Sequence, residues 1–498
     1  MEVTTLGPAW EASGMAGAVV QEHAKERPGR LPRFLAKPAP LATSGRLGTW
    51  PMWVLGLAVM LDSLDQYIVR GNANQIERAF RVGDFSIGLL FSAFIIVNGL
   101  ATMPAAYLGD RFNRTSIMAV TITAWSVLSA LGGLVPAGAF ALLLVLRGSL
   151  GFGQAVTDPS GSSLLADYYG IERRGRAFSL QQCLSYVGLG LGLSIGSFFG
   201  THFGHIGWRL GFGVSILPGL ATAFICWRLP EPRRGSADRG HVTHHEGLEV
   251  ASERLTMFPH GIRRFFLDMA VGLRDDVRTI LRIPTMAYAL VGVSTILFAV
   301  TAVSTWMPTL YQRQFHLSQA ASNSAFGALA IVAGIPGTLI GGALADRWVE
   351  KVAGARVVIP GVCIAASGSL FMVSFIPMPF APAYTIQLIA FVIAAASVPA
   401  LRAGLSDSVP AHLRGAGFGA FNLASIVFGA AAAPVATSAV AGAFGGDYRV
   451  AFSILMPLTI VGAVFLLAAR RHIDKDTAKI FEAVVTAMAA EAGERGSD

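Results

Sequence analysis

Charged residues are scarce in this chain. Only 14% of its 498 residues are Asp, Glu, Lys or Arg, whereas an ordinary soluble domain has about 25%. A soluble protein of this length would need far more charge to cover its surface. A disordered chain would not be 53% hydrophobic. The composition therefore excludes both classes and leaves a membrane protein.

Cysteine is equally scarce, and the motifs of common enzymes are missing. The three cysteines, Cys183, Cys226 and Cys363, all fall inside apolar runs, with no spacing typical of disulfides or metal ligands. The sequence contains no His-Asp-Ser grouping, no H-E-x-x-H and no Walker-type phosphate loop. We therefore expect a protein that is not an enzyme and that has no cofactor and no metal.

Long apolar runs, by contrast, recur along the whole chain. They are about 20 residues long, the length that a helix needs to cross a bilayer, whereas a β-barrel shows short alternating segments. The predicted spans are about 49–70, 85–108, 115–135, 139–162, 176–200, 210–229, 286–310, 323–345, 356–377, 383–405, 415–438 and 449–470. The sequence thus predicts an all-α, multi-pass membrane protein with twelve transmembrane helices.

The net charge of +8 indicates topology. The loops after the second, fourth, eighth and tenth spans are rich in arginine, whereas those near 136–138 and 378–382 contain no Lys or Arg. The positive-inside rule then places both termini in the cytoplasm, with the protein in the inner membrane if its source is bacterial. Because the excess charge marks these loops, we expect no nucleic-acid partner.

The segment 231–283 divides the spans into two groups of six. The predicted organisation is a tail at 1–48, a bundle at 49–230, a linker at 231–283, a bundle at 284–471 and a tail at 472–498. From about Phe258 to Leu281, apolar residues recur at helical spacing with arginines beside them. This pattern is typical of an amphipathic helix on the membrane surface. An ordinary linker helix is the alternative.

Three loop landmarks recur at an offset of about 240 residues. They match Asp110-Arg111 with Asp346-Arg347, Arg174-Gly175 with Arg414-Gly415, and Trp208-Arg209 with Tyr448-Arg449. Repeats of this kind decide an architecture. They predict two six-helix halves in parallel, related by an axis along the membrane normal.

The repeated loop resembles the signature of the major facilitator superfamily, which is roughly G-x-L-A-D-R-x-G-R. The second half has Gly342-Ala343-Leu344-Ala345-Asp346-Arg347, and the first half keeps Leu108, Asp110, Arg111 and Arg114. This resemblance implies the superfamily's fold of two six-helix bundles. It also implies a substrate site between the bundles near the midplane and transport by rocking of the halves.

Longer stretches resemble the spinster family. Asp62-Ser63-Leu64-Asp65-Gln66-Tyr67 stands where members read N-Y-M-D-R-F, and the run from Tyr107 to Arg114, YLGDRFNR, resembles Y-L-G-D-R-x-N-R. The resemblance implies a transporter of lysophospholipid-type lipids, or of sphingosine-1-phosphate in animal members, with protons as the proposed coupling ion. We expect a monomer that binds an amphiphilic, lipid-like substrate. A carrier for hydrophobic drugs or small organic anions is the alternative.

Charged residues near the predicted loops suggest a conformational latch. The six candidates are Asp110, Arg111, Arg114, Asp167, Asp346 and Arg347. A carboxylate at a helix end can face the positive N-terminus of a neighbouring helix, and the arginines can pair with an acidic group such as Asp167. Such contacts would hold the cytoplasmic side closed and break when the halves rock. Alternatively, the arginines only anchor the topology.

Ionisable residues inside spans are costly and are candidates for function. Asp62 and Asp65 share a face of the first helix, while Arg147, Gln154 and Asp158 share a face of the fourth. We expect these five residues to form the substrate and proton-coupling site, with Asp65 paired to Arg147. Protonation of Asp65 would release Arg147 to bind a phosphate head group or permit rocking. A static buried ion pair is the alternative.

Several residues depart from the spinster pattern. Gln66 replaces the family's Arg after the first-helix Asp, and Gln154 replaces its Glu in the fourth helix; neither glutamine can titrate. Arg70 is an additional charge near the outer end of the first helix. Either the proton site has moved to Asp62 and Asp65, or proton coupling is absent. Arg313, just outside the seventh span, is expected to be only interfacial.

Overall fold

The computed structural model describes residues 48–169, 171–232, 283–348, 355–407 and 423–472. Within these ranges the chain forms helices joined by short turns, with no β-strand. Twelve of the helical segments are long and apolar enough to cross a membrane. The predicted fold class is therefore confirmed, and the chain is an integral, multi-pass membrane protein. The proposed amphipathic helix at 258–281 lies outside the described residues.

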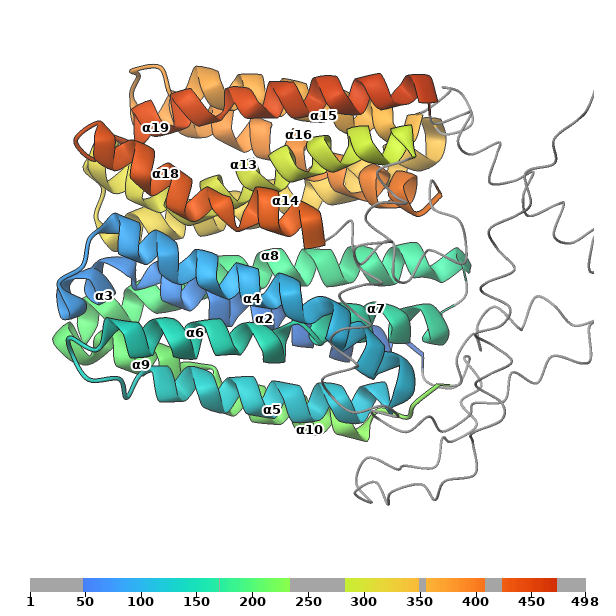
Figure 1. Ribbon diagram of the computed structural model, residues 1–498, viewed down its shortest axis with the longest axis horizontal. Coiled ribbons are helices and arrows are strands. Elements are labelled where there is room, and N and C mark those ends of the chain that lie inside the picture. Colours follow the sequence, from blue (N-terminus) through green and yellow to red (C-terminus); the bar gives the residue numbers. More distant parts are fainter. Residues whose placement is uncertain (1–47, 170, 233–282, 349–354, 408–422, 473–498) are drawn as a thin grey trace, which may run out of the picture.

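The helices fall into two groups that lie side by side with roughly parallel axes (Figure 1). The first group comprises α2 (Trp50–Gly71), α3 (Ala73–Phe80), α4 (Asp84–Arg111), α5 (Arg114–Gly132), α6 (Phe140–Gln154), α7 (Thr157–Tyr168), α8 (Ile171–His202), η2 (Gly204–Ile206), α9 (Gly207–Val214) and α10 (Ile216–Arg228). The second comprises α13 (Pro284–Phe315), α14 (Gln319–Trp348), α15 (Ala355–Ser374), α16 (Phe380–Asp407), η4 (Ile426–Ala430), α18 (Ala432–Ala443) and α19 (Tyr448–Leu455), which opens a span that runs to His472.

The two ends of the molecule differ, and we name them by their connections. The linker end is the one at which α10 ends and α13 begins, on the right of Figure 1. The distal end is the opposite one, where α3 lies. If the linker is cytoplasmic, as the arginine distribution predicts, the distal end faces outward.

Glycines on one face of α8 orient α2. A Cβ atom at Gly188, Gly192 or Gly196 would lie 2.2, 2.5 or 2.4 Å from a backbone oxygen of α2. The four-residue spacing puts these glycines on one face, so the two helices pack closely along several turns. With this face of α2 covered by α8, Asp65 is directed into its own bundle.

The apolar pattern predicts one continuous helix for the fourth span, but the structure shows two. It is divided between α6, which ends at Gln154, and α7, which begins at Thr157. Pro159 has no backbone N–H, so it cannot donate the helical hydrogen bond to the carbonyl of Ala155. The interruption is local, because Ala155 and Val156 keep right-handed helical backbone angles and the two helices together form one span, Phe140–Tyr168.

The two halves share a hydrophobic cluster. It includes Phe91 from the first half together with Trp306 and Tyr311 from the second. Two close approaches of backbones reinforce the contact: a Cβ atom at Gly190 would lie 3.0 Å from the Gly327 carbonyl oxygen, and one at Gly88 would lie 2.7 Å from that of Pro434. The boundary between the bundles is therefore tightly packed toward the distal end.

Candidate functional site

Asp65 of α2 is the centre of a buried polar cluster, and only 2% of it is exposed. Its Oδ2 accepts hydrogen bonds from Arg147 Nη1 at 3.2 Å and from Gln154 Nε2 at 3.3 Å. Its Oδ1 accepts hydrogen bonds from Ser215 Oγ at 3.0 Å and from Ser129 Oγ. Two of these donors come from α6, one from α5 and one from the residue before α10. The structure thus pairs Asp65 with Arg147, as the sequence predicts.

The surroundings of Arg147 hold its guanidinium in place. The side chain is 3% exposed, and the guanidinium carbon lies 5.7 Å from the ring centroids of both Phe94 and Phe212. Aromatic faces attract a cation, and burial strengthens this attraction. Arg147 is therefore balanced by one carboxylate and confined by two rings.

A second carboxylate is joined to this cluster through amides. Gln66 Nε2 donates to Asp62 Oδ2 at 3.3 Å and to Gln154 Oε1 at 3.4 Å, and Gln154 in turn donates to Asp65. The structure therefore connects four of the five predicted site residues, together with Gln66. Asp62 Oδ1 is buried and has no hydrogen-bond partner among the described residues.

Asp158 is not hydrogen-bonded into this network. It lies in the first turn of α7, exposed, and no hydrogen bond or ion pair joins it to the other four residues within the described part of the chain. Its negative charge nevertheless acts on Asp62 across the site, so its membership of the site stays a prediction.

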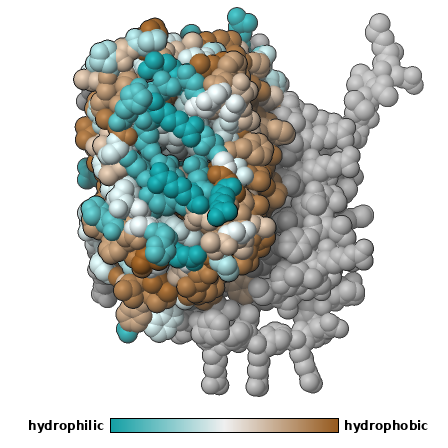
Figure 2. Space-filling view, turned by 90° about the vertical axis from the view of Figure 1, so that its left-hand side faces the viewer, coloured by the Kyte–Doolittle hydropathy of each residue, from teal (hydrophilic) through white to brown (hydrophobic). Residues whose placement is uncertain are grey.

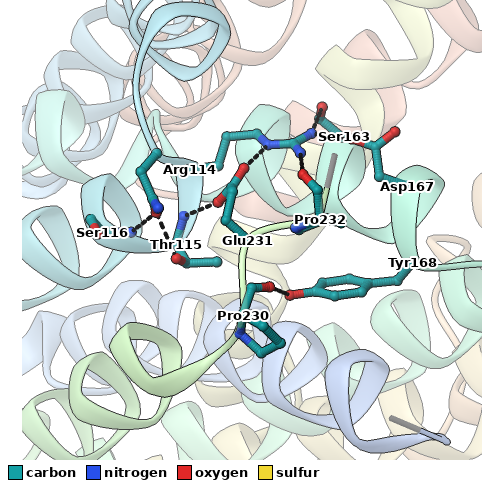
Figure 3. Close-up of polar contacts among 10 residues, drawn as sticks. Arg114, Thr115, Ser116, Ser163, Asp167, Tyr168, Pro230, Glu231 and Pro232 are labelled. Atoms are coloured by element: carbon teal, nitrogen blue, oxygen red, sulfur yellow. Dashed lines mark hydrogen bonds and ion pairs between the residues drawn. The ribbon is translucent and has the colours of Figure 1, made fainter. Parts of the chain in front are cut away.

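Arg114 forms a second ion-pair cluster at the linker end (Figure 3). Its side chain is 1% exposed and donates to Asp167 Oδ2 at 2.6 Å, to Glu231 Oε1 at 2.7 Å and to Ser163 Oγ at 2.6 Å. Glu231 also accepts from the backbone N–H of Thr115 at 3.1 Å. The pairing of Arg114 with Asp167 follows the sequence-based expectation, whereas the role of Glu231 was missed.

Asp167, Glu231 and Ser163, the partners of Arg114, all belong to the first half. They join α5, α7 and the segment after α10, and they do not reach the second bundle. In this conformation Arg114 thus stabilises one bundle. The other proposed latch residues, Asp110, Arg111, Asp346 and Arg347, lie in the helical backbones of α4 and α14, and their side chains are outside the described part of the structure.

A third cluster joins the halves at the distal end, around Asp84. Arg313 donates from Nη1 and Nη2 to the two carboxylate oxygens of Asp84 at 2.7 and 2.8 Å, and the Tyr448 hydroxyl donates to Oδ2 at 2.9 Å. The expectation that Arg313 is only interfacial was wrong, because α13 continues to Phe315 and carries the side chain across to α4. Such a two-pronged pair is the strong geometry for arginine and carboxylate.

Amide side chains extend this contact. Asn74 donates to Gln312 at 2.5 Å, while Gln319 and Asn323 donate to the Gly71 carbonyl at 2.8 and 3.1 Å. Every hydrogen bond recorded between described residues of the two halves lies at the distal end. On that face, hydrophilic residues gather across the middle and hydrophobic ones surround them (Figure 2). We call Asp84, Arg313, Tyr448 and these amides the distal latch.

Glu77 of α3 lies beside the distal latch and holds a proton there. Burial, a hydrogen bond to Asp84 and the negative charge of Asp84 together raise the pKa of Glu77 to about 8, against the opposing positive charges of Arg313 and Arg78. At neutral pH the protonated Glu77 therefore donates to Asp84. Sequence reasoning did not single out Glu77, because only the fold brings it near Arg313.

This proton predicts a pH dependence of stability. In an opened or unfolded chain the pKa of Glu77 returns toward 4.5, so the latched state binds a proton that the other state releases. The stabilising contribution is complete below pH 4.5 and is lost as the pH rises to about 8. We expect the melting temperature to fall over this range by an amount equivalent to about 1 kcal/mol, because partial exposure of Glu77 screens the effect.

Glu77→Gln tests this expectation, because an amide donates to Asp84 at every pH. The variant should melt at a nearly constant temperature between pH 5 and 8, measured in buffered detergent. An unchanged slope relative to the unmodified protein would assign the pH dependence to other groups.

Among the described residues, no group of three or more His, Cys, Asp and Glu is close enough to hold a metal ion. The three cysteines are free thiols. The polar clusters are instead ion pairs and hydrogen-bond networks between transmembrane helices, which is the type of site found in transporters.

Comparison with known proteins defines the class. Residues 55–427 match the model of the Major Facilitator Superfamily, so the chain belongs to this family of membrane transporters. Within it the chain is spinster-like. It is 26% identical over 303 residues to protein spinster homolog 1 of Xenopus laevis, covering 58% of this chain and 52% of that one.

Two other similar proteins support this placement. The sphingosine-1-phosphate transporter SPNS2 of Danio rerio is 26% identical over 335 residues, which cover 65% of this chain and 62% of that one. The matches thus span about half to three-fifths of these relatives. The crystal structure of a bacterial homolog of spinster, inward-facing and unoccupied, superposes with a TM-score of 0.64 at 20% identity. It covers 88% of this chain and 98% of that one, and it supports the fold.

Proposed function

We propose that the protein is a secondary active transporter that moves an amphiphilic, lipid-like substrate of the lysophospholipid type by alternating access. The observation that carries this proposal is the buried network of Asp65, Arg147, Gln154, Gln66 and Asp62, set in helices that cross the membrane. Such groups are expensive at this depth and are retained where ions or polar substrates pass.

The distal latch supports alternating access. It joins α3 and α4 of the first half to α13 and α19 of the second through an ion pair and several amides. With the linker end in the cytoplasm, this arrangement closes the outer side. Transport would then require these contacts to break and others to form at the linker end.

Asp65 is the proposed site of proton coupling. The ionised carboxylate accepts all four of its hydrogen bonds, two of them on the oxygen that faces Arg147. Protonation would neutralise the carboxylate and weaken its attraction to Arg147. The freed guanidinium would bind a phosphate head group in two-pronged geometry or let the helices shift. Gln154 relays the change to Gln66 and Asp62.

The proposed substrate class rests on the shared hydrophobic cluster and on the relatives. The cluster contains apolar side chains of both bundles, including Phe212 beside Arg147, so apolar surface borders the polar network. One similar protein is named a sphingosine-1-phosphate transporter, and others are named spinster proteins. Together these support an amphiphile with a charged head.

Uptake of a labelled lysophospholipid into vesicles that contain the purified protein tests both the proposed proton coupling and the proposed substrate class. We expect an imposed pH gradient to change the uptake rate several-fold and Asp65→Asn to abolish the difference. Equal rates with and without the gradient would contradict coupling. Transport of a hydrophobic drug or a small organic anion, with no uptake of lysolipid, would replace the proposed substrate class.

A further inference from the structure

The proposed mechanism does not use Arg70, which lies on a polar face of α2. Asp62, Gln66 and Arg70 follow one another at intervals of four residues, so they lie on one side of the helix. Each interval advances about 6 Å along the axis. The face thus carries a carboxylate toward the linker end, an amide in the middle and a cation toward the distal end.

The guanidinium of Arg70 has no carboxylate partner among the described residues. Its carbon lies 4.3 Å from the ring centroid of Tyr67 and 5.4 Å from that of Phe91. The side chain is half-buried, and its Nε is buried without a hydrogen-bond partner. An unpaired buried donor is costly. By contrast Arg114, Arg147 and Arg313 each contact a carboxylate.

The rings beside Arg70 place it at the boundary between the bundles. Phe91 belongs to the hydrophobic cluster that includes Trp306 and Tyr311 of the second half, and Tyr67 packs against the same cluster. The side chain also reaches back along the helix, since it overlies Tyr67, which precedes it by three residues. The cation therefore approaches the level of Gln66.

Asp62 has a carboxylate oxygen that accepts no hydrogen bond from the described residues. Gln66 occupies Oδ2, while Oδ1 is buried and has no partner. A free carboxylate oxygen and a free guanidinium nitrogen thus lie on one helix face, separated by a glutamine. Arg147 is a poorer candidate for an anion in this state, because Asp65 already neutralises it.

We propose that Asp62 and Arg70 form a two-ended subsite in which Arg70 binds the phosphate of the substrate and Asp62 binds its ammonium group. This proposal rests on the proposed function and adds an orientation: the phosphate lies toward the distal end and the ammonium toward the linker end.

Binding to the full-length protein in detergent, measured by calorimetry, tests the subsite with four probes. Oleoyl lysophosphatidylethanolamine and sphingosine phosphate carry both groups, oleoyl lysophosphatidylglycerol carries only the phosphate, and oleylamine carries only the ammonium. Arg70→Gln should weaken the three phosphate probes about tenfold to a hundredfold, as expected for a lost charge-assisted contact, and leave oleylamine unchanged.

Asp62→Asn should give the converse pattern: weaker binding of the three ammonium probes and unchanged binding of lysophosphatidylglycerol. Arg228→Gln is the matched control, because Arg228 also lies over aromatic rings but is exposed. It should bind all four probes normally. Melting temperatures of the free variants establish that each is folded.

The outcomes separate the two proposals. If the unmodified protein binds none of the three phosphate probes, the proposed substrate class fails. If it binds them and Arg70→Gln weakens all four probes equally, or none, the subsite is overturned while the substrate class stands. Weakening of all probes by an equal factor would assign Arg70 to packing against Tyr67 and Phe91.

Discussion

Replacing Arg147 with methionine is expected to abolish transport and to destabilise the protein by about 3–5 kcal/mol. Methionine fills a similar space between Phe94 and Phe212, but it leaves the Asp65 carboxylate buried without its ionic partner. Removing one member of a buried pair costs more than the pair itself contributes. Melting temperature in detergent and uptake into vesicles measure the two effects separately.

The double variant Arg147→Met with Asp65→Asn distinguishes charge from shape. With no buried charge left unpaired, stability should recover by a large part of the loss, while transport should stay absent. Restored transport would show that the pair is a structural element only. Arg147→Lys, which keeps the charge but loses the planar donors, should retain stability better than methionine does.

Reversing the charge of Arg313 is expected to open the distal end. In Arg313→Glu two carboxylates would face each other where Asp84 now accepts two hydrogen bonds. Like charges in this position cost about 2 kcal/mol, which is roughly a thirtyfold shift in the equilibrium between closed and open states. The value is moderate because the Arg313 side chain is 38% exposed.

Spin labels at Arg81 and Ser318, in a background without the three cysteines, would report this opening as a longer distance by electron resonance. Both positions are exposed at the distal end, one in each half. Asp84→Arg combined with Arg313→Glu restores opposite charges and should restore the short distance. If Arg313→Glu leaves the distance unchanged, the amides and the hydrophobic cluster hold the halves together without the ion pair.

The membrane-spanning class could be predicted from the sequence because it depends on local properties. An apolar run of sufficient length must form a helix in lipid, where every backbone group needs an internal partner. The repeated loops likewise predicted the pairing of halves. Asp65 and Arg147 were found because a charge inside an apolar span stands out without any knowledge of the fold.

The contacts that cross long sequence distances could not be predicted in this way. Arg313 is 229 residues from Asp84, and Glu231 is 117 residues from Arg114. Near the loops, charged residues are common, so no pattern marks the ones that pair. The local interruption of the helix after Gln154 was also not predicted.

The sequence by itself determined the number of spans, the two-fold repeat and the few charges placed inside the membrane, because each follows from the cost of burying polar groups in lipid. Only the tertiary structure decided which of those charges are neutralised and which are not. Asp65 receives four donors from three other parts of its bundle, whereas Arg70, five residues further along the same helix, receives no carboxylate among the described residues. That difference depends on which neighbours the packing of α2 against α8 allows each side chain to reach.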